Sequence, residues 1–405
     1  MTDVAGFRAA GHAWRLHCGA RVIESGLAEA VARAGAKRAF VICSPSVHRR
    51  GDTVARIAVV LGERFAGMFD GIGKDSTYAS VQAARAAAAA ASADLLIAAG
   101  GGSVIVAVRA VAILLAERDD PFRLMTQYPE GKPAFSPRLL APKLPIINIP
   151  TTPTSAMNRA GTGLLNPDLD HRMEFFDPKT RPQAIFLDEG ALMSVPTVLV
   201  RSTATTVFAG AVAALGQVAA NPLAEGDRDQ AFRLARRGYE RLATAPSDPA
   251  PRLDLALAAF LQNRAEDDGA ARFRGGVFGG DYAVSTALHL LFPQVGQGEA
   301  TAVVHAPRIR LADRVDLRVA RQVAAGLGVW RTGMDGMAAA EAVADALERT
   351  YRRAEMPTRL RDLGLARGDL APVARATVKN FNANAGARSP QTQVAAALRL
   401  LEAAY

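Results

Sequence analysis

The sequence predicts an α/β domain with a parallel, Rossmann-like sheet, followed by an all-α domain. Two observations support this. Before Pro196, short apolar segments alternate with helical patterns, and beyond it strand-like segments all but vanish while helical patterns continue. Such alternation favours a parallel sheet with helices on both faces, and ligands bind at the carboxyl ends of its strands. Because a chain of 405 residues exceeds one ordinary core, we expect domains at 1–193 and 194–405, with an active cleft between them.

The first domain opens with a strand or hairpin, and its elements then alternate. The first clear buried strand reads KRAFVIC and stops at Ser44 and Pro45. Ser76 or Thr77 is placed to cap an alanine-rich helix, since hydroxyl side chains accept hydrogen bonds from the free N–H groups of a first turn. The expected order is strand or hairpin 11–22, helix 23–34, strand 37–43, helix 54–65, strand 68–73 and helix 77–91.

The segment ADLLIAAGGGSVIVAVR, residues 93–109, is the centre of the first domain. Its apolar part has the pattern of a strand buried on both faces. Gly100, Gly101 and Gly102 let the backbone turn sharply and approach a ligand, because none carries a Cβ. Ser103 then stands in an N-cap position before helix 104–117. Free N–H groups and the helix dipole suit such a turn to a pyrophosphate. The alternative is a tight turn that binds nothing.

Two further strands are expected in this domain, at 144–149 and 183–188. Thr151 and Thr152 follow the first of them, so their hydroxyls can reach the ligand of the glycine turn. A turn in which threonine only caps the next segment is the alternative. In the second domain, helical patterns cover 197–218, 228–242, 252–262, 281–291, several segments after Leu317, and an amphipathic segment at 391–405.

The composition excludes several classes of protein. The net charge of +9 is spread along the chain, without a dense basic segment interleaved with aromatic residues, so no nucleic acid is expected as a partner. No apolar segment of membrane-spanning length and no signal pattern is expected either. Cys18 and Cys43 form no CxxC pair. We therefore expect a protein of the reducing cytoplasm, with no membrane partner.

Together these pieces resemble the iron-containing alcohol dehydrogenase family, whose relatives include maleylacetate reductases and dehydroquinate-synthase-like enzymes. The family's GGGS motif matches residues 100–103, with a basic residue in the next helix at Arg109, and its Pro-Thr-Thr motif matches 150–152. Its strand with an acidic end matches IFLD at 185–188. The resemblance implies the family fold and an NAD or NADP cofactor, and we also expect a homodimer. The cofactor-binding residues that it implies are Gly100, Gly101, Gly102, Ser103, Thr151, Thr152, Ser155 and Arg172.

Two departures from the family pattern lie in the first domain. Val106 stands where an aspartate is usual in the helix after GGGS, a loss that maleylacetate reductases share. Ser44 stands where members that prefer NAD often carry an aspartate, and His48, Arg49 and Arg50 follow it. A hydroxyl and guanidinium groups suit a 2′-phosphate better than a carboxylate does. Ser44 and Arg49 therefore favour NADPH, the alternative being a solvated loop.

A larger departure concerns the metal that the family binds. The four ligand positions fall on Thr206, Gly210, Ser285 and Gln297, which include no imidazole, carboxylate or thiolate. We expect no iron or zinc at these positions. Thr206, Ser285 and Gln297 are instead candidate substrate contacts. The family position that often carries a substrate-facing histidine matches His289, our candidate proton donor, since imidazole titrates near neutral pH. A buried core histidine is the alternative.

These observations predict an NAD(P)-dependent oxidoreductase that interconverts an alcohol and a ketone without a metal, in a biosynthetic tailoring step, on a small-molecule or peptide substrate. Hydrogen-bond donors must then stabilise the developing alkoxide. One alternative is a dehydrogenase that oxidises the C-terminal threonine of a ribosomal peptide (the daptide type), after which the β-keto acid loses carbon dioxide. The other is a catalytically inactive scaffold subunit that keeps its nucleotide site.

Overall fold

The computed structural model describes residues 6–130, 132–217, 221–267, 276–380 and 389–405. It divides into two compact units, one of Ala13–Pro196 and one of Thr197–Tyr405 together with the described residues up to His12. The second unit therefore begins three residues after the predicted boundary at Ser194, because helix 197–215 starts there. Residues 6–12 group with the helical unit, whereas the sequence placed them in the first domain.

The first unit is built on a six-stranded sheet in the order β1-β8-β5-β4-β2-β3, and every neighbouring pair is parallel. The predicted α/β fold with a parallel sheet is confirmed. The strands are β1 (Arg15–Gly19), β2 (Ala39–Cys43), β3 (Phe65–Phe69), β4 (Leu95–Gly100), β5 (Ile146–Pro150) and β8 (Ala184–Asp188). The helices are α1 (Val22–Arg33), α2 (Pro45–Arg50), α3 (Thr53–Leu61), α4 (Tyr78–Ala90), α5 (Gly102–Ala116), α6 (Pro121–Leu124) and α7 (Glu189–Met193).

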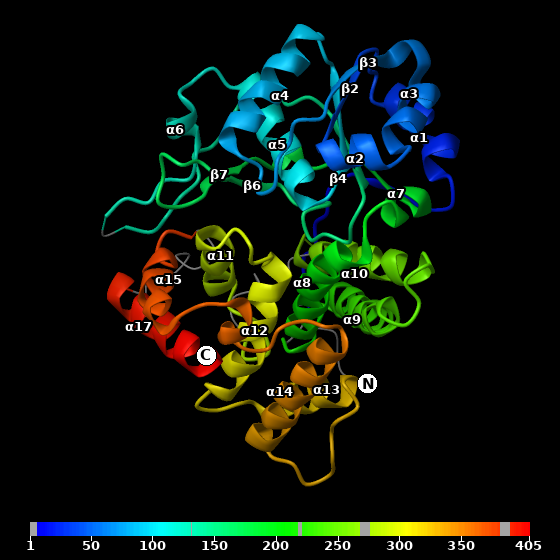
Figure 1. Cartoon of the computed structure of the whole chain (residues 1–405). Helices are drawn as coiled ribbons and strands as arrows, with labels where there is room; N and C mark the ends of the chain where they lie inside the picture. The colour runs from blue at the N-terminus through cyan, green and yellow to red at the C-terminus, as the bar shows by residue number, and fades with distance from the viewer. Residues whose placement is uncertain (1–5, 131, 218–220, 268–275, 381–388) are drawn as a thin grey trace. The chain divides into compact units, whose positions relative to one another are not determined.

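Helices cover both faces of this sheet. Alternate strand residues such as Val41, Ile97 and Phe186 form one fully buried core with Leu27 of α1 and Ile57 of α3. On the other side of the sheet, α5 packs against β2, β4 and β5, and α4 packs against β3. Figure 1 shows α4 and α5 together there. Burying one such aliphatic or aromatic side chain contributes about 1.5–3 kcal/mol, which explains why the central strands are apolar along their whole length.

Several local expectations differ from the structure. Helix α5 begins at Gly102 with Gly101 as its N-cap, so Ser103 lies in the first turn and not at the cap. Strand β4 continues through Gly100, which leaves only Gly101 for the turn. Thr77 does cap α4, since its Oγ1 accepts from the Ser80 N–H at 3.2 Å. An antiparallel hairpin of β6 (Gly161–Leu164) and β7 (Met173–Phe176) was not expected.

The second unit consists of helices in its described part (Figure 1). Leu288, Val303, Val373 and Leu401 belong to one core that joins four of them. The α-helices are α8 (Thr197–Leu215), α9 (Pro222–Leu242), α10 (Ala250–Asp267), α11 (Tyr282–Leu291), α12 (Gln297–Arg310), α13 (Leu317–Gly326), α14 (Gly336–Arg353), α15 (Leu370–Ala376) and α17 (Pro390–Ala404). Short 3₁₀ turns lie at Leu360–Leu363 and Arg367–Asp369.

Helix α8 corrects one expectation from the sequence. It has 19 residues and a mean hydropathy of 1.6, so by length and composition it could cross a membrane. However, 56% of its apolar window is buried inside the protein. Val200, Phe208 and Val212 are among its buried residues. The core helix of a soluble protein has the same length and composition, and burial of this kind is what such a helix needs.

Candidate functional site

The glycine turn (residues 100–102) and the threonine loop (residues 151–160, between β5 and β6) lie together at the carboxyl edge of the sheet in the first unit. Strands β4 and β5 are neighbours, and the Thr151 N–H donates to the Gly100 carbonyl at 3.1 Å. A Cβ added at Gly101 would lie 3.2 Å from Thr152 Oγ1, and one at Gly102 would lie 3.0 Å from Thr154 Oγ1. The two glycines therefore leave a cradle beside threonine hydroxyls that a larger residue would fill.

One buried polar atom of this cradle forms no hydrogen bond with the described residues. The hydroxyl of Thr152 is buried and has no hydrogen-bond partner among the described residues. A buried polar atom without a partner costs about 1–3 kcal/mol, so a group that the structure does not contain is expected to pair with it. The first turn of α5 starts beside this hydroxyl, and its N–H groups and dipole favour an anion there. The residues present fit a phosphate of a dinucleotide.

Arg109 fixes the loop that carries these threonines. The residue is 1% exposed, and its guanidinium donates to the carbonyls of Ala156 and Gly161. Burial lowers its pKa to about 9, which leaves it protonated at neutral pH. Asn148 Nδ2 donates to the Met157 carbonyl at 2.7 Å, so a further carbonyl of the loop is held by a buried side chain. From the sequence, Arg109 is expected only as part of a motif, although a single arginine in an apolar helix is a signal of such a role.

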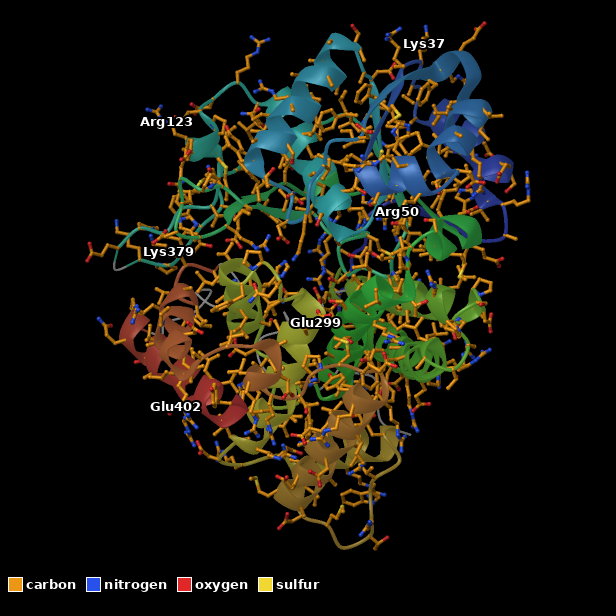
Figure 2. All side chains as sticks on the ribbon, viewed as in Figure 1. Lys37, Arg50, Arg123, Glu299, Lys379 and Glu402 are labelled. Atoms are coloured by element: carbon orange, nitrogen blue, oxygen red, sulfur yellow. The ribbon has the colours of Figure 1, made fainter. Side chains whose placement is uncertain are left out.

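The proposed 2′-phosphate residues follow β2. Ser44 Oγ lies 3.0 Å from Ser46 Oγ, and α2 starts at the next residue, where a loop was the alternative. Arg49 and Arg50 are exposed on α2, and Figure 2 labels Arg50 there. His48 Nδ1 donates to Asp70 Oδ2 at 2.8 Å. Asp70 was missed in the sequence because nothing in its neighbourhood marks it as facing the end of β2.

The other two cofactor candidates of this unit lie farther along the chain. Ser155 is exposed in the threonine loop. Arg172 immediately precedes β7, and its Nη1 donates to the Gly163 carbonyl at 3.3 Å. Its Cδ would lie 3.4 Å from a Cβ added at Gly163, so the side chain runs along the β6–β7 hairpin. The hairpin thus holds Arg172 by packing as well as by a hydrogen bond.

In the helical unit the structure brings two of the substrate candidates together. Gln297 Nε2, at the start of α12, donates to Ser285 Oγ of α11 at 2.9 Å. His289 lies one turn after Ser285, is 8% exposed, and its Nδ1 lies 2.7 Å from the Val295 carbonyl. Because a carbonyl only accepts, Nδ1 carries the proton, and in the neutral ring Nε2 is the basic nitrogen. Thr206 on α8 instead donates to the Thr203 carbonyl at 2.7 Å.

Comparison with known proteins finds a family likeness in the first unit. The model of the iron-containing alcohol dehydrogenases matches residues 15–189, which include the glycine turn and the threonine loop. This match covers 175 of the 405 residues, so the likeness to that family lies in the first unit. A 1,3-propanediol dehydrogenase of Klebsiella pneumoniae is 26% identical over 263 residues, which are 64% of this chain. The chain spans 65% of the length of that relative.

Solved structures share the fold over the whole chain. A 1,3-propanediol oxidoreductase has a TM-score of 0.83 at 21% identity, covering 99% of this chain and 100% of the other. A maleylacetate reductase from Agrobacterium tumefaciens has a TM-score of 0.74 at 20% identity, covering 99% of this chain and 98% of its own. These likenesses establish the fold of both units.

The family's name implies iron, and the side chains at the expected ligand positions do not fit it. A Cβ added at Gly210 would lie 2.5 Å from Gln262 Oε1, so the amide of Gln262 takes the room that a ligand side chain would need. Gln262 is itself fixed, since its Nε2 donates to the Val207 carbonyl at 3.0 Å. Ser285 and Gln297 pair with each other. Within the described residues, no group of three or more His, Cys, Asp or Glu side chains could hold a metal ion.

Proposed function

We propose that this protein is a member of the iron-containing alcohol dehydrogenase family and an NAD(P)-dependent oxidoreductase that interconverts an alcohol and a ketone without a metal ion. The observation that carries the proposal is the cradle at Gly101 and Gly102, where the buried hydroxyl of Thr152 has no partner among the described residues. When bound, the nicotinamide nucleotide supplies or accepts the hydride. The first turn of α5 and the threonine loop hold its pyrophosphate, and Arg109 keeps that loop in place.

In this proposal His289 moves the proton. Its Nδ1–H is committed to the Val295 carbonyl, which fixes the ring orientation and assigns proton exchange to Nε2. Gln297 is the candidate hydrogen-bond donor to the substrate oxygen, because its amide carries two N–H bonds and Ser285 takes one. Hydrogen-bond donors take over the charge stabilisation that a metal gives elsewhere in the family.

The substrate is proposed to be a small oxygen-bearing molecule or a peptide, handled in a biosynthetic tailoring step. The names of two similar proteins, a 1,3-propanediol dehydrogenase and a maleylacetate reductase, support the alcohol or keto group as the reacting one. A cytoplasmic homodimer stays a prediction from the sequence.

The deciding experiment is a titration of metal-stripped protein with NADPH and with NADH, followed by nicotinamide fluorescence. We expect saturable binding that changes less than about twofold when Fe²⁺ or Zn²⁺ is added, since the donor atoms needed for those ions are absent from the ligand positions. Failure to bind either nucleotide would contradict the proposal. Binding without turnover in a screen of keto acids and alcohols would favour the alternative function, a catalytically inactive scaffold subunit that keeps its nucleotide site.

We further propose a preference for NADPH, supported by Ser44 and by the exposed guanidinium of Arg49. Arg49→Glu should lower the affinity for NADPH about tenfold more than that for NADH, which corresponds to about 1.4 kcal/mol. Arg123→Glu, at an exposed cation of α6 in the same unit, is the matched control for net charge. An equal effect of Arg49→Glu on both nucleotides would retire the preference.

A further inference from the structure

We propose that the His48–Asp70 pair determines which nucleotide the first unit accepts, by holding a carboxylate away from the position of the 2′-phosphate. This inference rests on the proposed nucleotide binding. The pair joins the ends of two neighbouring strands, and its hydrogen bond from His48 Nδ1 to Asp70 Oδ2 is 2.8 Å long. Both side chains are close to half exposed, at 45% and 46%, so a ligand at this edge can reach them.

The register of the sheet places Asp70 beside Cys43, the residue that precedes Ser44. Strands β2 and β3 are parallel neighbours, Ser44 is the first residue after β2, and Asp70 is the first after β3. The Ile72 N–H donates to the Cys43 carbonyl at 3.3 Å and draws the Asp70 loop against the end of β2. Burial, together with the nearby Asp70 carboxylate, raises the pKa of the Cys43 thiol to about 12. The carboxylate is therefore close to the residue that precedes Ser44.

The negative and positive charges at this edge favour different nucleotides. A free carboxylate accepts hydrogen bonds from the 2′- and 3′-hydroxyls of NAD and repels a 2′-phosphate. Arg49 and Arg50 on α2 attract that phosphate. His48 decides between them, since its Nδ1–H occupies Oδ2 of Asp70. With His48 in place, the attraction of Arg49 and Arg50 for the 2′-phosphate is larger than the repulsion by Asp70, and NADPH binds. Without His48, the Asp70 carboxylate is free to turn toward the ribose.

The test measures dissociation constants for NADPH and NADH on the full chain by nicotinamide fluorescence. His48→Ala should lower the preference for NADPH about tenfold, equivalent to about 1.4 kcal/mol, by weakening NADPH and strengthening NADH. Asp70→Asn should raise the preference, because the amide does not repel phosphate. In the double variant the loss caused by His48→Ala should disappear, which a merely structural role of His48 would not produce. Asp119→Asn, at an exposed carboxylate elsewhere in the unit, is the charge control.

Each outcome bears on one proposal. If wild-type protein binds nucleotide but His48→Ala leaves the ratio of the two constants unchanged, the inference is overturned and the proposed function stands. If His48→Ala lowers the ratio equally with and without Asp70→Asn, His48 contacts the phosphate itself and the pair is not the selector. If wild-type protein binds neither nucleotide, the proposed function fails, and the inference fails with it.

Discussion

A single substitution at Gly101 tests whether the glycine turn binds the nucleotide. A Cβ at this position would lie 3.2 Å from Thr152 Oγ1, and the branched groups of valine would extend into the space that we assign to the phosphate. Gly101→Val should therefore weaken nucleotide binding by about 100-fold or more, or about 2.7 kcal/mol, in the fluorescence titration.

Its control separates binding from folding. Gly226→Val places the same side chain on α9, where an added Cβ would meet no atom within 4 Å. The far-ultraviolet circular dichroism of both variants should match that of the wild type, since Gly101 has a φ of −77°, which other residues adopt freely. Unchanged nucleotide affinity in Gly101→Val would remove the site from the glycine turn.

His289 distinguishes catalysis from packing through two substitutions. Asparagine can place its Nδ2–H where His289 Nδ1 donates to the Val295 carbonyl, but it cannot exchange a proton at neutral pH. His289→Asn should keep the stability and the nucleotide affinity of the wild type while kcat falls about 100-fold or more. His289→Ala should lose kcat and stability together. Full activity of His289→Asn in a steady-state assay would show that His289 is a buried core histidine without a role in catalysis.

At the scale of the element, the loop after β5 depends on a buried cation. Replacing Arg109 by methionine keeps much of its volume but removes the guanidinium donors to the carbonyls of Ala156 and Gly161, and leaves the Ala156 carbonyl with the Arg159 N–H at 3.4 Å. Each buried carbonyl without a donor costs about 1–3 kcal/mol, offset in part by the relief of burying a charge. We expect Arg109→Met to lower the free energy of unfolding in urea and to weaken nucleotide binding, and Arg109→Lys to restore part of both. Wild-type nucleotide affinity in Arg109→Met would show that the loop is positioned by other contacts.

A buried histidine should make the helical unit sensitive to acid. His305 Nδ1 accepts from Tyr351 OH at 2.6 Å, its Nε2 donates to the Phe278 carbonyl at 2.9 Å, and burial lowers its pKa from 6.5 to about 4. The unfolded chain binds this proton at a higher pH than the folded one, so stability is full above pH 6.5 and falls as the pH drops toward 4. The full loss is about 3 kcal/mol.

The measurement compares the free energy of unfolding of the wild type and of His305→Gln at several values between pH 7 and pH 4.5. Glutamine can accept from Tyr351 and donate to Phe278, but it does not titrate. The difference between the two proteins should shrink as the pH falls. Parallel curves would show that protonation of His305 is not what weakens the fold.

An element can be predicted from the sequence when a local pattern of residues determines it, and cannot when contacts between distant segments do. Strands β2, β4 and β8 were predicted closely because both of their faces are buried, which leaves a continuous apolar segment. The four-residue strands β6 and β7 lie in a polar, glycine-containing stretch and pair only with each other, so they have no such pattern. The closeness of Gly100 and Thr151 could be predicted, because the carboxyl ends of neighbouring parallel strands lie at the same edge of a sheet. The pairing of His48 with Asp70 and the insertion of Gln262 against Gly210 depend on packing between distant segments, which no local pattern records.

At the scale of the whole molecule, the two compact units offer different contributions to one proposed reaction. The residues assigned to the nucleotide all lie in Ala13–Pro196, and those assigned to proton transfer and the substrate oxygen lie in the helical unit. The units also carry one tryptophan each, Trp14 and Trp330, the latter with Arg321 stacked 5.6 Å from its ring centroid. The unfolding of each unit can therefore be followed separately, in a Trp330→Phe variant for the first and a Trp14→Phe variant for the second.

This arrangement predicts where nucleotide stabilises the chain. At a free NADPH concentration of about 100 times Kd, the unit that binds it gains about 2.7 kcal/mol. The urea midpoint followed by Trp14 should rise accordingly, while that followed by Trp330 should move much less, because the phosphate and ribose contacts come from the first unit. The same titration with Gly101→Val should leave both midpoints unchanged, which separates binding from a solvent effect of the nucleotide. A shift confined to the Trp330 signal would contradict the assignment, since it would place the nucleotide on the helical unit and leave the glycine turn as a structural connection between β4 and α5.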